Sequence, residues 1–221
     1  MDNIVIVGSR GHAKYIIEIV EREGKYKIAG LIDRFRDPGS QTQGYPVLGK
    51  EEDLPSLIGA HSLKGVIIGI GDNVIRSTVA ATVGSLCPGL SFVNAIHPGT
   101  SIARDVFIGK GTVIYPGHIL GPGCSIGRFS ILFTNSSLGH DSTMGDFASL
   151  GARVVTGGYC EIGAYAAVNI GAVLVDRVSV GEHAVIGAGS TVLASVGPHA
   201  VAYGTPAQVI RARRQAQDPV P

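Results

Sequence analysis

The sequence of 221 residues has no tryptophan, an aromatic content of only 6%, and three cysteines, Cys87, Cys124 and Cys160. An odd, widely spaced set of cysteines argues against a disulfide framework and against a zinc site. No apolar run approaches the roughly 18 residues that a membrane span requires. The formal net charge is +1, without a basic stripe or an acidic tail, so nothing indicates a nucleic-acid partner or a disordered tail.

The first eight residues read Met-Asp-Asn-Ile-Val-Ile-Val-Gly and lack the basic segment and the cleavage site of a signal peptide. We therefore expect a buried strand at the N-terminus and a cytoplasmic protein. Glycine, unlike the aromatic residues, is abundant, with 32 occurrences. This composition favours a fold of tight turns and small, regularly spaced inward residues.

A period of six residues runs through the second half of the chain. From Ile96 onward, 16 of 17 residues at this spacing are aliphatic or methionine, and Thr156 is the exception. The series is Ile96, Ile102, Ile108, Ile114, Leu120, Ile126, Leu132, Leu138, Met144, Leu150, Thr156, Ile162, Val168, Leu174, Val180, Ile186 and Val192. Four residues after most of these positions stands a small side chain, such as Ser136 or Ala148.

This period matches neither an α-helix nor a simple strand alternation. It predicts short strands separated by corners, three to a coil of 18 residues, with the aliphatic residue inside and the small residue at the turn. Stacked coils pair as parallel strands, which satisfies the backbone polar groups. We predict a parallel β-helix of hexapeptide repeats over residues 96 to about 197.

The first part of the chain alternates strands with helices. Apolar strand segments are expected at residues 4–7, 28–32 and 66–70, with residues 91–93 as a fourth candidate. Helices are expected over about 12–23 and after Gly71-Asp72-Asn73. This pattern predicts a small Rossmann-like parallel sheet, in which ligands bind at the carboxyl ends of the strands.

The turn Gly8-Ser9-Arg10-Gly11-His12 joins the first strand to the first helix and suits a phosphate, because free helix N–H groups face it. Its spacing differs from GxGxxG and the segment is half a dinucleotide fold, so a mononucleotide is favoured over NAD. His12 either contacts the ligand or caps and fills the turn. Asp33, at the end of the second strand, either bonds a sugar or base or caps a turn. Glycines serving turn geometry alone are the alternative for the whole segment.

Of the seven histidines, His140 is the candidate general base, because the adjacent Asp141 can fix its tautomer and raise its basicity. One coil further lies Gly158, which leaves room and a bare N–H for a reacting carbonyl. A solvated corner histidine is the alternative. The column of residues at this position is Arg104, Pro122, His140, Gly158, Asp176 and Ala194.

The other histidines carry weaker expectations. His61 is expected in a loop, and His97, His183 and His199 at polar repeat or cap positions. His118 occupies a small-residue position, where it either lies near a site or distorts a corner. No partner histidines fall at the spacing of a coil, so we predict no metal site.

Five motifs occur in order: GxxGH after the first strand, Gly71-Asp72-Asn73-x-x-Arg76, Ala95-Ile96-His97-Pro98, His140-Asp141 and Gly204-Thr205-Pro206-Ala207. With them the chain resembles the bacterial sialic-acid O-acetyltransferase and nucleotide-aminosugar N-acetyltransferase family (PglD/NeuD-like) over residues 3–212. The resemblance implies a Rossmann-like nucleotide-sugar-binding domain at 1–94 and a left-handed β-helix acetyltransferase domain with a C-terminal tail at 95–221. It also implies a homotrimer with acetyl-CoA bound between neighbouring β-helices.

The resemblance also assigns site residues. His140 is implied as the base with Asp141 as its partner. The nucleotide side is implied to comprise Gly8, Gly11, His12, Asp33, Gly71, Asn73 and Arg76. The coenzyme side is implied to comprise Gly158, Ala188, Pro206 and Ala207. Arg211, Arg213 and Arg214 either meet coenzyme phosphates or form a solvated basic end.

The chain departs from the family at two positions: Ser149 and Phe133 stand where relatives carry a second histidine and an asparagine. Thr156, which breaks the repeat two residues before Gly158, is a further candidate for the acetyl site. The expected function is acetyl-CoA-dependent N-acetylation of a nucleotide-linked amino sugar by direct transfer. The alternatives are an O-acetyltransferase of a sialic-acid-type sugar and a non-catalytic sugar-nucleotide-binding protein.

Overall fold

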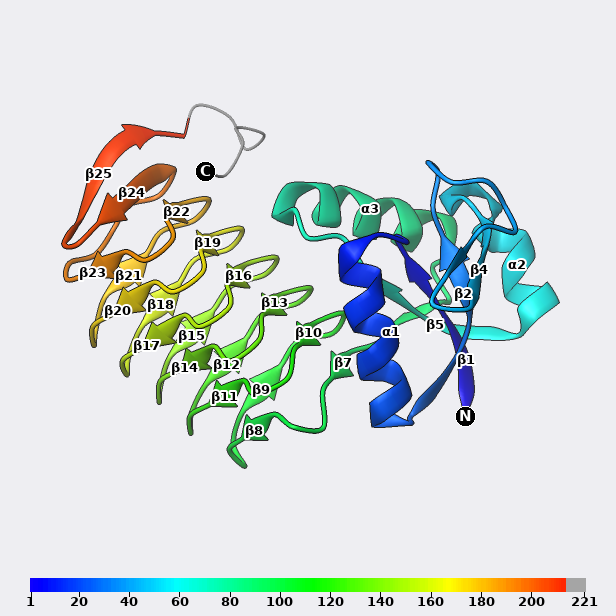
Figure 1. Ribbon diagram of the computed structural model, residues 1–221, viewed down its shortest axis with the longest axis horizontal. Helices are drawn as coiled ribbons and strands as arrows, with labels where there is room; N and C mark the ends of the chain where they lie inside the picture. The colour runs from blue at the N-terminus through cyan, green and yellow to red at the C-terminus, as the bar shows by residue number, and fades with distance from the viewer. Residues whose placement is uncertain (214–221) are drawn as a thin grey trace. The chain divides into compact units, whose positions relative to one another are not determined.

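The computed structural model describes residues 1–213, and the chain divides into two compact units, Met1–Pro98 and a second that begins at Gly99 (Figure 1). The expected domain boundary, after residue 94, precedes this division by four residues. We refer to the two units as the N-terminal unit and the β-helix unit.

The N-terminal unit is built on a six-stranded sheet with the order β3-β4-β2-β1-β5-β6. All its neighbouring strands are parallel except the antiparallel pair β3 and β4. The strands are β1 (Asp2–Val7), β2 (Tyr26–Ile32), β3 (Gln41–Thr42), β4 (Tyr45–Gly49), β5 (Leu63–Ile68) and β6 (Ser91–Phe92). The parallel Rossmann-like sheet predicted from the sequence is confirmed, and β3 and β4 are additions to it.

The helices of this unit are α1 (Gly11–Glu23), the short 3-10 helix η1 (Glu51–Asp53), α2 (Leu54–His61) and α3 (Asn73–Leu86). Helix α1 buries Ile16, Ile17 and Val20 on one face, as its apolar spacing indicates. Helix α3 begins with Asp72 as its N-cap, whose carboxylate accepts the N–H groups of Val74 and Ile75. The expectation of a loop at His61 is wrong, because a short apolar segment folds there as α2.

The repeats of the β-helix, which begin just before the division at Pro98, form two-residue strands that pair in parallel in three sheets (Figure 1). The repeat strands are β7 (Ala95–Ile96), β8 (Ser101–Ile102), β9 (Phe107–Ile108), β10 (Val113–Ile114), β11 (Ile119–Leu120), β12 (Ser125–Ile126), β13 (Ile131–Leu132), β14 (Ser137–Leu138), β15 (Thr143–Met144), β16 (Ser149–Leu150), β17 (Val155–Thr156), β18 (Glu161–Ile162), β19 (Ala167–Val168), β20 (Val173–Leu174), β21 (Ser179–Val180), β22 (Val185–Ile186) and β23 (Thr191–Val192). A hairpin of β24 (Ala200–Gly204) and β25 (Ala207–Ala212) follows. The register advances by one coil at a time, as in the pairing of Ile114 with Leu132 and of Leu132 with Leu150.

The second residue of each repeat strand belongs to the predicted six-residue series, and from Leu120 to Val192 all of these residues, Thr156 included, are buried. The small residues four positions later are buried as well, including Cys124 and Cys160. Burial raises the pKa of both thiols, so they stay protonated and serve as packing groups. The six-residue pattern therefore predicted the core of the β-helix correctly.

The corners of the coils have a feature that the pattern did not indicate. Every sixth residue from Gly111 to Gly189 has a left-handed backbone, with φ between 54° and 74°. Many of these residues are not glycine, although each such residue costs about 1 kcal/mol relative to glycine. Five aromatic rings at such left-handed corners stack one above another, with neighbouring ring centroids 4.5–5.2 Å apart. They belong to Phe129, Phe147, Tyr165, His183 and His199. Two of the histidines expected at polar positions thus pack as aromatic rings.

Candidate active site

The candidate base lies at the corner between β14 and β15. The Nδ1 atom of His140 lies 2.9 Å from Oδ2 of Asp141, and the imidazole is 54% exposed. In the neutral imidazole Nδ1 carries the hydrogen, because an ionised carboxylate accepts a hydrogen bond and cannot donate one, and Nε2 keeps its lone pair. The pair therefore leaves the Nε2 edge of the imidazole as the position that can accept a proton.

Gly158 lies one coil beyond His140, against the reactive edge of the ring. A Cβ atom at this position would stand 2.5 Å from Nε2 of His140, closer than real Cβ atoms approach any neighbour. Only glycine therefore allows the ring to lie there. The structure brings the two residues together at the spacing that the sequence indicated.

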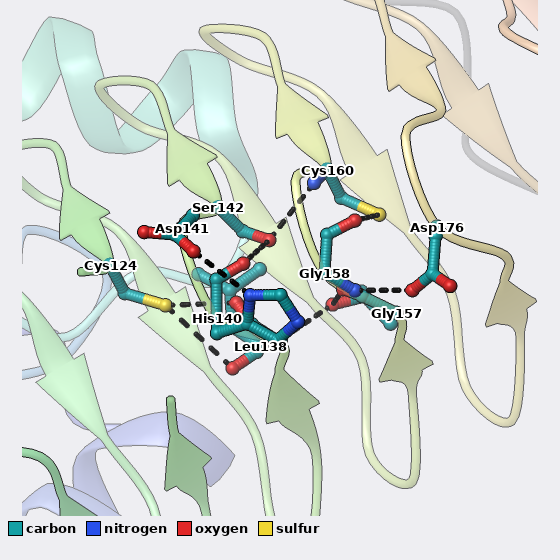
Figure 2. Close-up of polar contacts among 11 residues, drawn as sticks. Cys124, Leu138, His140, Asp141, Ser142, Gly157, Gly158, Cys160 and Asp176 are labelled. Carbon is teal, nitrogen blue, oxygen red and sulfur yellow. Dashed lines mark hydrogen bonds and ion pairs between the residues drawn. The ribbon is translucent and has the colours of Figure 1, made fainter. Parts of the chain in front are cut away.

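The backbone N–H of Gly158 is occupied in the structure. It donates to Oδ1 of Asp176 in the following coil, at 2.6 Å (Figure 2). The expectation of a bare N–H is therefore wrong, because the next residue of the same column turns its carboxylate onto it. A Cβ at Gly157 would overlap this Asp176 oxygen, so both glycines are needed for the arrangement.

Thr156, the break in the aliphatic series, braces this turn. Its hydroxyl accepts the N–H of Gly139 at 2.9 Å and donates to the carbonyl of Gly157 at 3.1 Å. The threonine is nearly buried, and an aliphatic residue there would leave the Gly139 N–H without this partner. It thus ties the backbone that carries His140 to the Gly157-Gly158 turn.

Two side chains that the sequence interpretation did not single out surround the base. The ring of Tyr159 meets the His140 imidazole edge-on, with centroids 5.1 Å apart. The guanidinium of Arg177 lies over the Tyr159 ring, 4.8 Å from its centroid. The signal was available, because Tyr159 and Arg177 follow Asp141 at intervals of one coil.

The N-terminal unit holds a cavity of 460 Å³ at the carboxyl ends of β1, β2 and β5. Of the seven residues implied for the nucleotide side, five line it: Gly8, Gly11, His12, Asp33 and Gly71. A second hollow of 550 Å³ shares Ser9, Arg10 and Gly11 with the first and adds the cations Lys14 and Arg36. The unit therefore offers a recess with a polar, cationic extension.

Asp33 is held in place within the cavity wall. Oδ2 accepts the hydroxyl of Ser9 at 2.5 Å and Oδ1 accepts the N–H of Phe35 at 2.9 Å. His12 lies so close to Gly71 that a Cβ there would overlap its ring. Burial, followed by the charge of Arg76, lowers the pKa of His12, so this ring is neutral near pH 7.

The other two implied nucleotide residues have a different place. Arg76 is 1% exposed, and its guanidinium donates to the carbonyls of Ile70 and Gly71 and to the side chain of Asn73. Neither Arg76 nor Asn73 lines the cavity. They shape the turn between β5 and α3, because a buried guanidinium needs acceptors and the carbonyls of that turn supply them.

Sequence reasoning missed several residues that line the cavity. Phe35 and Ile75 expose apolar side chains there, and Glu51 contributes a buried carboxylate that pairs with Arg34 at 3.1 Å. Glu51 comes from η1, which the apolar pattern could not indicate. The exposed Phe35, directly after a strand end, was a signal that could have been used.

The residues implied for the coenzyme tail lie near the last coils. The hydroxyl of Thr205, next to Pro206, lies 3.5 Å from the carbonyl of Gly189, next to Ala188. Pro206 and Ala207 stand at the turn of the hairpin between β24 and β25. Arg213 is nearly buried and donates to the carbonyl of His183, Arg211 is exposed, and Arg214 lies outside the described residues.

The remaining candidates have structural places. Phe133 packs on Tyr115 with centroids 5.1 Å apart, and Ser149 is half-buried in β16. His118 is fully buried, with Nδ1 2.7 Å from Oγ of Ser136.

Within residues 1–213, no three His, Cys, Asp or Glu side chains gather closely enough to hold a metal ion. No helix of this part of the chain is long and apolar enough to cross a membrane.

Comparison with known proteins finds similar chains among acetyltransferases. The family model described as the PglD N-terminal domain matches residues 3–83. A crystal structure of a histidine-to-asparagine variant of perosamine N-acetyltransferase from Caulobacter crescentus, in complex with CoA and GDP-perosamine, matches with a TM-score of 0.89. That match is 29% identical in sequence and covers 96% of this chain and 98% of the other. The predicted resemblance to the PglD-like acyltransferases is confirmed.

Two further relatives refine the likeness. UDP-N-acetylbacillosamine N-acetyltransferase of Bacillus subtilis (strain 168) is 28% identical over 120 residues, which are 52% of this chain and 51% of that protein. The matched stretch thus spans about half the length of this relative. The acetyltransferase domain of PglB from Neisseria gonorrhoeae FA1090, in complex with acetyl coenzyme A, has a TM-score of 0.85 at 23% identity over 94% of this chain and 98% of that one, which shows the fold alone. The predicted left-handed β-helix is confirmed.

Proposed function

We propose that the chain is an acetyl-CoA-dependent N-acetyltransferase that acts on a nucleotide-linked amino sugar. The observation that carries the proposal is the His140–Asp141 pair, with the Nε2 edge of the imidazole against Gly158. It stands on a fold shared with perosamine N-acetyltransferase, whose structure contains CoA and GDP-perosamine. The predicted enzyme class and co-substrate agree with these relatives.

His140 acts as the general base. Its Nε2 takes a proton from the sugar amine as the amine nitrogen adds to the thioester carbonyl of acetyl-CoA, and Asp141 stabilises the imidazolium that forms. The tetrahedral intermediate then collapses: the carbon–sulfur bond breaks, the amide remains on the sugar, and the imidazolium returns its proton to the departing thiolate. No side-chain nucleophile takes part, which agrees with the buried, protonated state of Cys124 and Cys160.

The nucleotide of the amino-sugar substrate occupies the N-terminal unit. The 460 Å³ cavity has the size and the mixture of apolar walls and fixed polar groups that small-molecule sites show. Within residues 1–213 no side chain caps the N-terminus of α1, an end of a helix that suits a diphosphate. Asp33, fixed by Ser9 and by the Phe35 N–H, can accept a hydrogen bond from a sugar or a base.

The homotrimer, its acetyl-CoA sites between neighbouring β-helices and the cytoplasmic location belong to this proposal. The first two are supported by the family resemblance. Light scattering of the purified protein measures the trimer directly.

The substitution His140→Ala tests the function. General-base catalysis contributes roughly 10²–10⁴ in rate, so we expect kcat to fall by about that factor. The thermal unfolding midpoint should stay within about a degree, because the ring is exposed. Acetyl transfer is followed by thiol release from acetyl-CoA with GDP-, UDP- and dTDP-linked amino sugars.

The matched control is His61→Ala in α2, which should retain the activity of the parent protein. A His140→Ala variant with near-parental kcat would exclude His140 as the base. Binding of nucleotide and coenzyme without turnover on any amino sugar would instead favour the non-catalytic alternative.

A further inference from the structure

We infer that the Asp176 carboxylate accepts the backbone N–H of Gly158 in the free protein and that the acetyl carbonyl replaces it when acetyl-CoA binds. The inference rests on the proposed function, because it assigns a partner to the thioester. It makes Asp176 a positioning residue, acting through the Gly158 peptide. Three observations of the β-helix unit support it.

The first observation is the position of the Asp176 oxygen. Oδ1 lies 2.6 Å from the Gly158 nitrogen, and the same glycine touches Nε2 of His140 on its open side (Figure 2). The N–H that Asp176 occupies therefore belongs to the residue that lies against the base. Donors that hold an oxyanion lie about 2.7–3.1 Å from it. The carboxylate oxygen thus marks the place of the developing oxyanion.

The second observation comes from a second aspartate in the same role. Asp146 accepts the backbone N–H of Arg128, one coil earlier, at 2.7 Å. Its other oxygen is held by the guanidinium of Arg128 at 2.9 and 2.6 Å. Asp146 is therefore clamped at both oxygens, as a purely structural cap should be.

Asp176 lacks such a clamp. Within residues 1–213 its carboxylate is exposed and has one hydrogen bond, the one to Gly158. The neighbouring Arg177 lies over Tyr159 instead of pairing with it. Asp176 can therefore leave for water by breaking a single hydrogen bond, whereas Asp146 cannot.

The third observation is the absence of side chains in the turn. A Cβ at Gly157 would overlap the Asp176 oxygen, and a Cβ at Gly158 would overlap the His140 ring. Because Gly157 and Gly158 carry no side chains, the Gly158 N–H can bind either the Asp176 carboxylate or the acetyl carbonyl. Only one oxygen can occupy it, so the Asp176 carboxylate and the acetyl carbonyl exclude each other. Free CoA has no such carbonyl and does not compete.

The test compares acetyl-CoA with CoA by isothermal titration calorimetry on the full chain. In Asp176→Ala the competitor is gone, so acetyl-CoA should bind about tenfold more tightly while CoA binds as before. Asp176→Asn keeps an acceptor without charge and should give an intermediate ratio of the two affinities. Asp146→Ala removes a cap of the same geometry away from His140 and should leave the ratio unchanged.

An acetyl-CoA to CoA affinity ratio that is the same in the parent protein, Asp176→Ala and Asp176→Asn overturns the inference. An equal change of the ratio in Asp146→Ala overturns it as well. If Asp176→Ala does not fold, Asp176→Asn decides. Binding of neither coenzyme by the parent protein overturns the proposed function together with the inference, whereas binding with an unchanged ratio and loss of turnover in His140→Ala overturns the inference alone.

Discussion

The two units gather their site residues in different ways. In the N-terminal unit, the residues that line the cavity come mainly from the turns after β1, β2 and β5 and from η1. These segments are irregularly spaced along the chain. In the β-helix unit, His140, Gly158 and Asp176 follow one another at the constant interval of a coil. Where the backbone repeats, a contact can be found by counting residues. Where it does not, the contact depends on packing.

This difference decided what the sequence could predict in the β-helix unit. Counting placed Gly158 beside His140 and put the aliphatic series in the core. It could not show that Asp176, named in the same column, turns its carboxylate back onto the Gly158 N–H, because this depends on a side-chain rotamer. It also gave no sign that corners with Phe, Tyr or Arg adopt a left-handed backbone.

In the N-terminal unit the sequence predicted the residues at strand ends and missed those brought in by packing. Gly8, His12 and Asp33 follow apolar strands, and all of them line the cavity. Glu51 comes from a short helix without apolar periodicity and was not predicted. Arg76 was assigned by motif to the ligand, but its buried guanidinium binds the carbonyls of its own turn.

The two units also differ in how they bury a large polar side chain. Arg76 in the N-terminal unit is surrounded by acceptors. His118 in the β-helix unit has Ser136 on Nδ1, while its buried Nε2 finds no partner within residues 1–213. A repeated core offers every coil the same apolar environment, so an unusual residue is accommodated less completely. The predictions below test these contrasts, from the largest expected effect to the smallest.

The largest effect is acid destabilisation through His118. Burial lowers the pKa of His118 from 6.5 to about 3. Because the folded value lies below the unfolded one, the neutral ring's contribution is complete above about pH 6.5 and is lost as the pH falls toward 3. Between pH 7 and pH 4 the free energy of unfolding should fall by about 3 kcal/mol from this residue.

Urea unfolding at both pH values measures this loss. His118→Ser, which places a side chain like that of Ser136 in the corner, should remove most of the acid sensitivity, whereas His61→Ser should not. Equal acid sensitivity of the parent protein and His118→Ser would show that other groups govern it.

The next effect concerns the contact between Gly158 and His140, which lie one coil apart. In Gly158→Ala the new Cβ displaces the His140 ring, since it would stand 2.5 Å from Nε2. A misplacement of about 1 Å can cost 10²-fold, so we expect kcat to fall about a hundredfold. Steady-state kinetics check this against Gly197→Ala, where no atom lies within 4 Å of the added Cβ. Unchanged turnover in Gly158→Ala would show that the ring tolerates the shift.

The smallest effect lies in the N-terminal unit. In Gly71→Ala the added Cβ overlaps the His12 ring, so the ring must move from its position in the cavity wall. We expect nucleoside diphosphate affinity to fall about tenfold, the loss of about one hydrogen bond to a charged group. Calorimetry with GDP and UDP measures it, with Gly59→Ala in α2 as the control, since its added Cβ meets no atom within 4 Å. Unaltered affinity for both nucleotides would place the ligand away from His12.

The constant register of the β-helix has a consequence for how such a site can change. Removing one whole coil of 18 residues would shorten the stack and leave every later side chain on its original face. Removing a single hexad would preserve the aliphatic series but rotate all later residues by a third of a turn, from one sheet to the next. A six-residue deletion between His140 and Gly158, which the core tolerates, would thus carry Gly158 and Asp176 away from His140. The core constrains the length of an insertion or deletion to multiples of six residues, while the active site constrains it to multiples of a full coil.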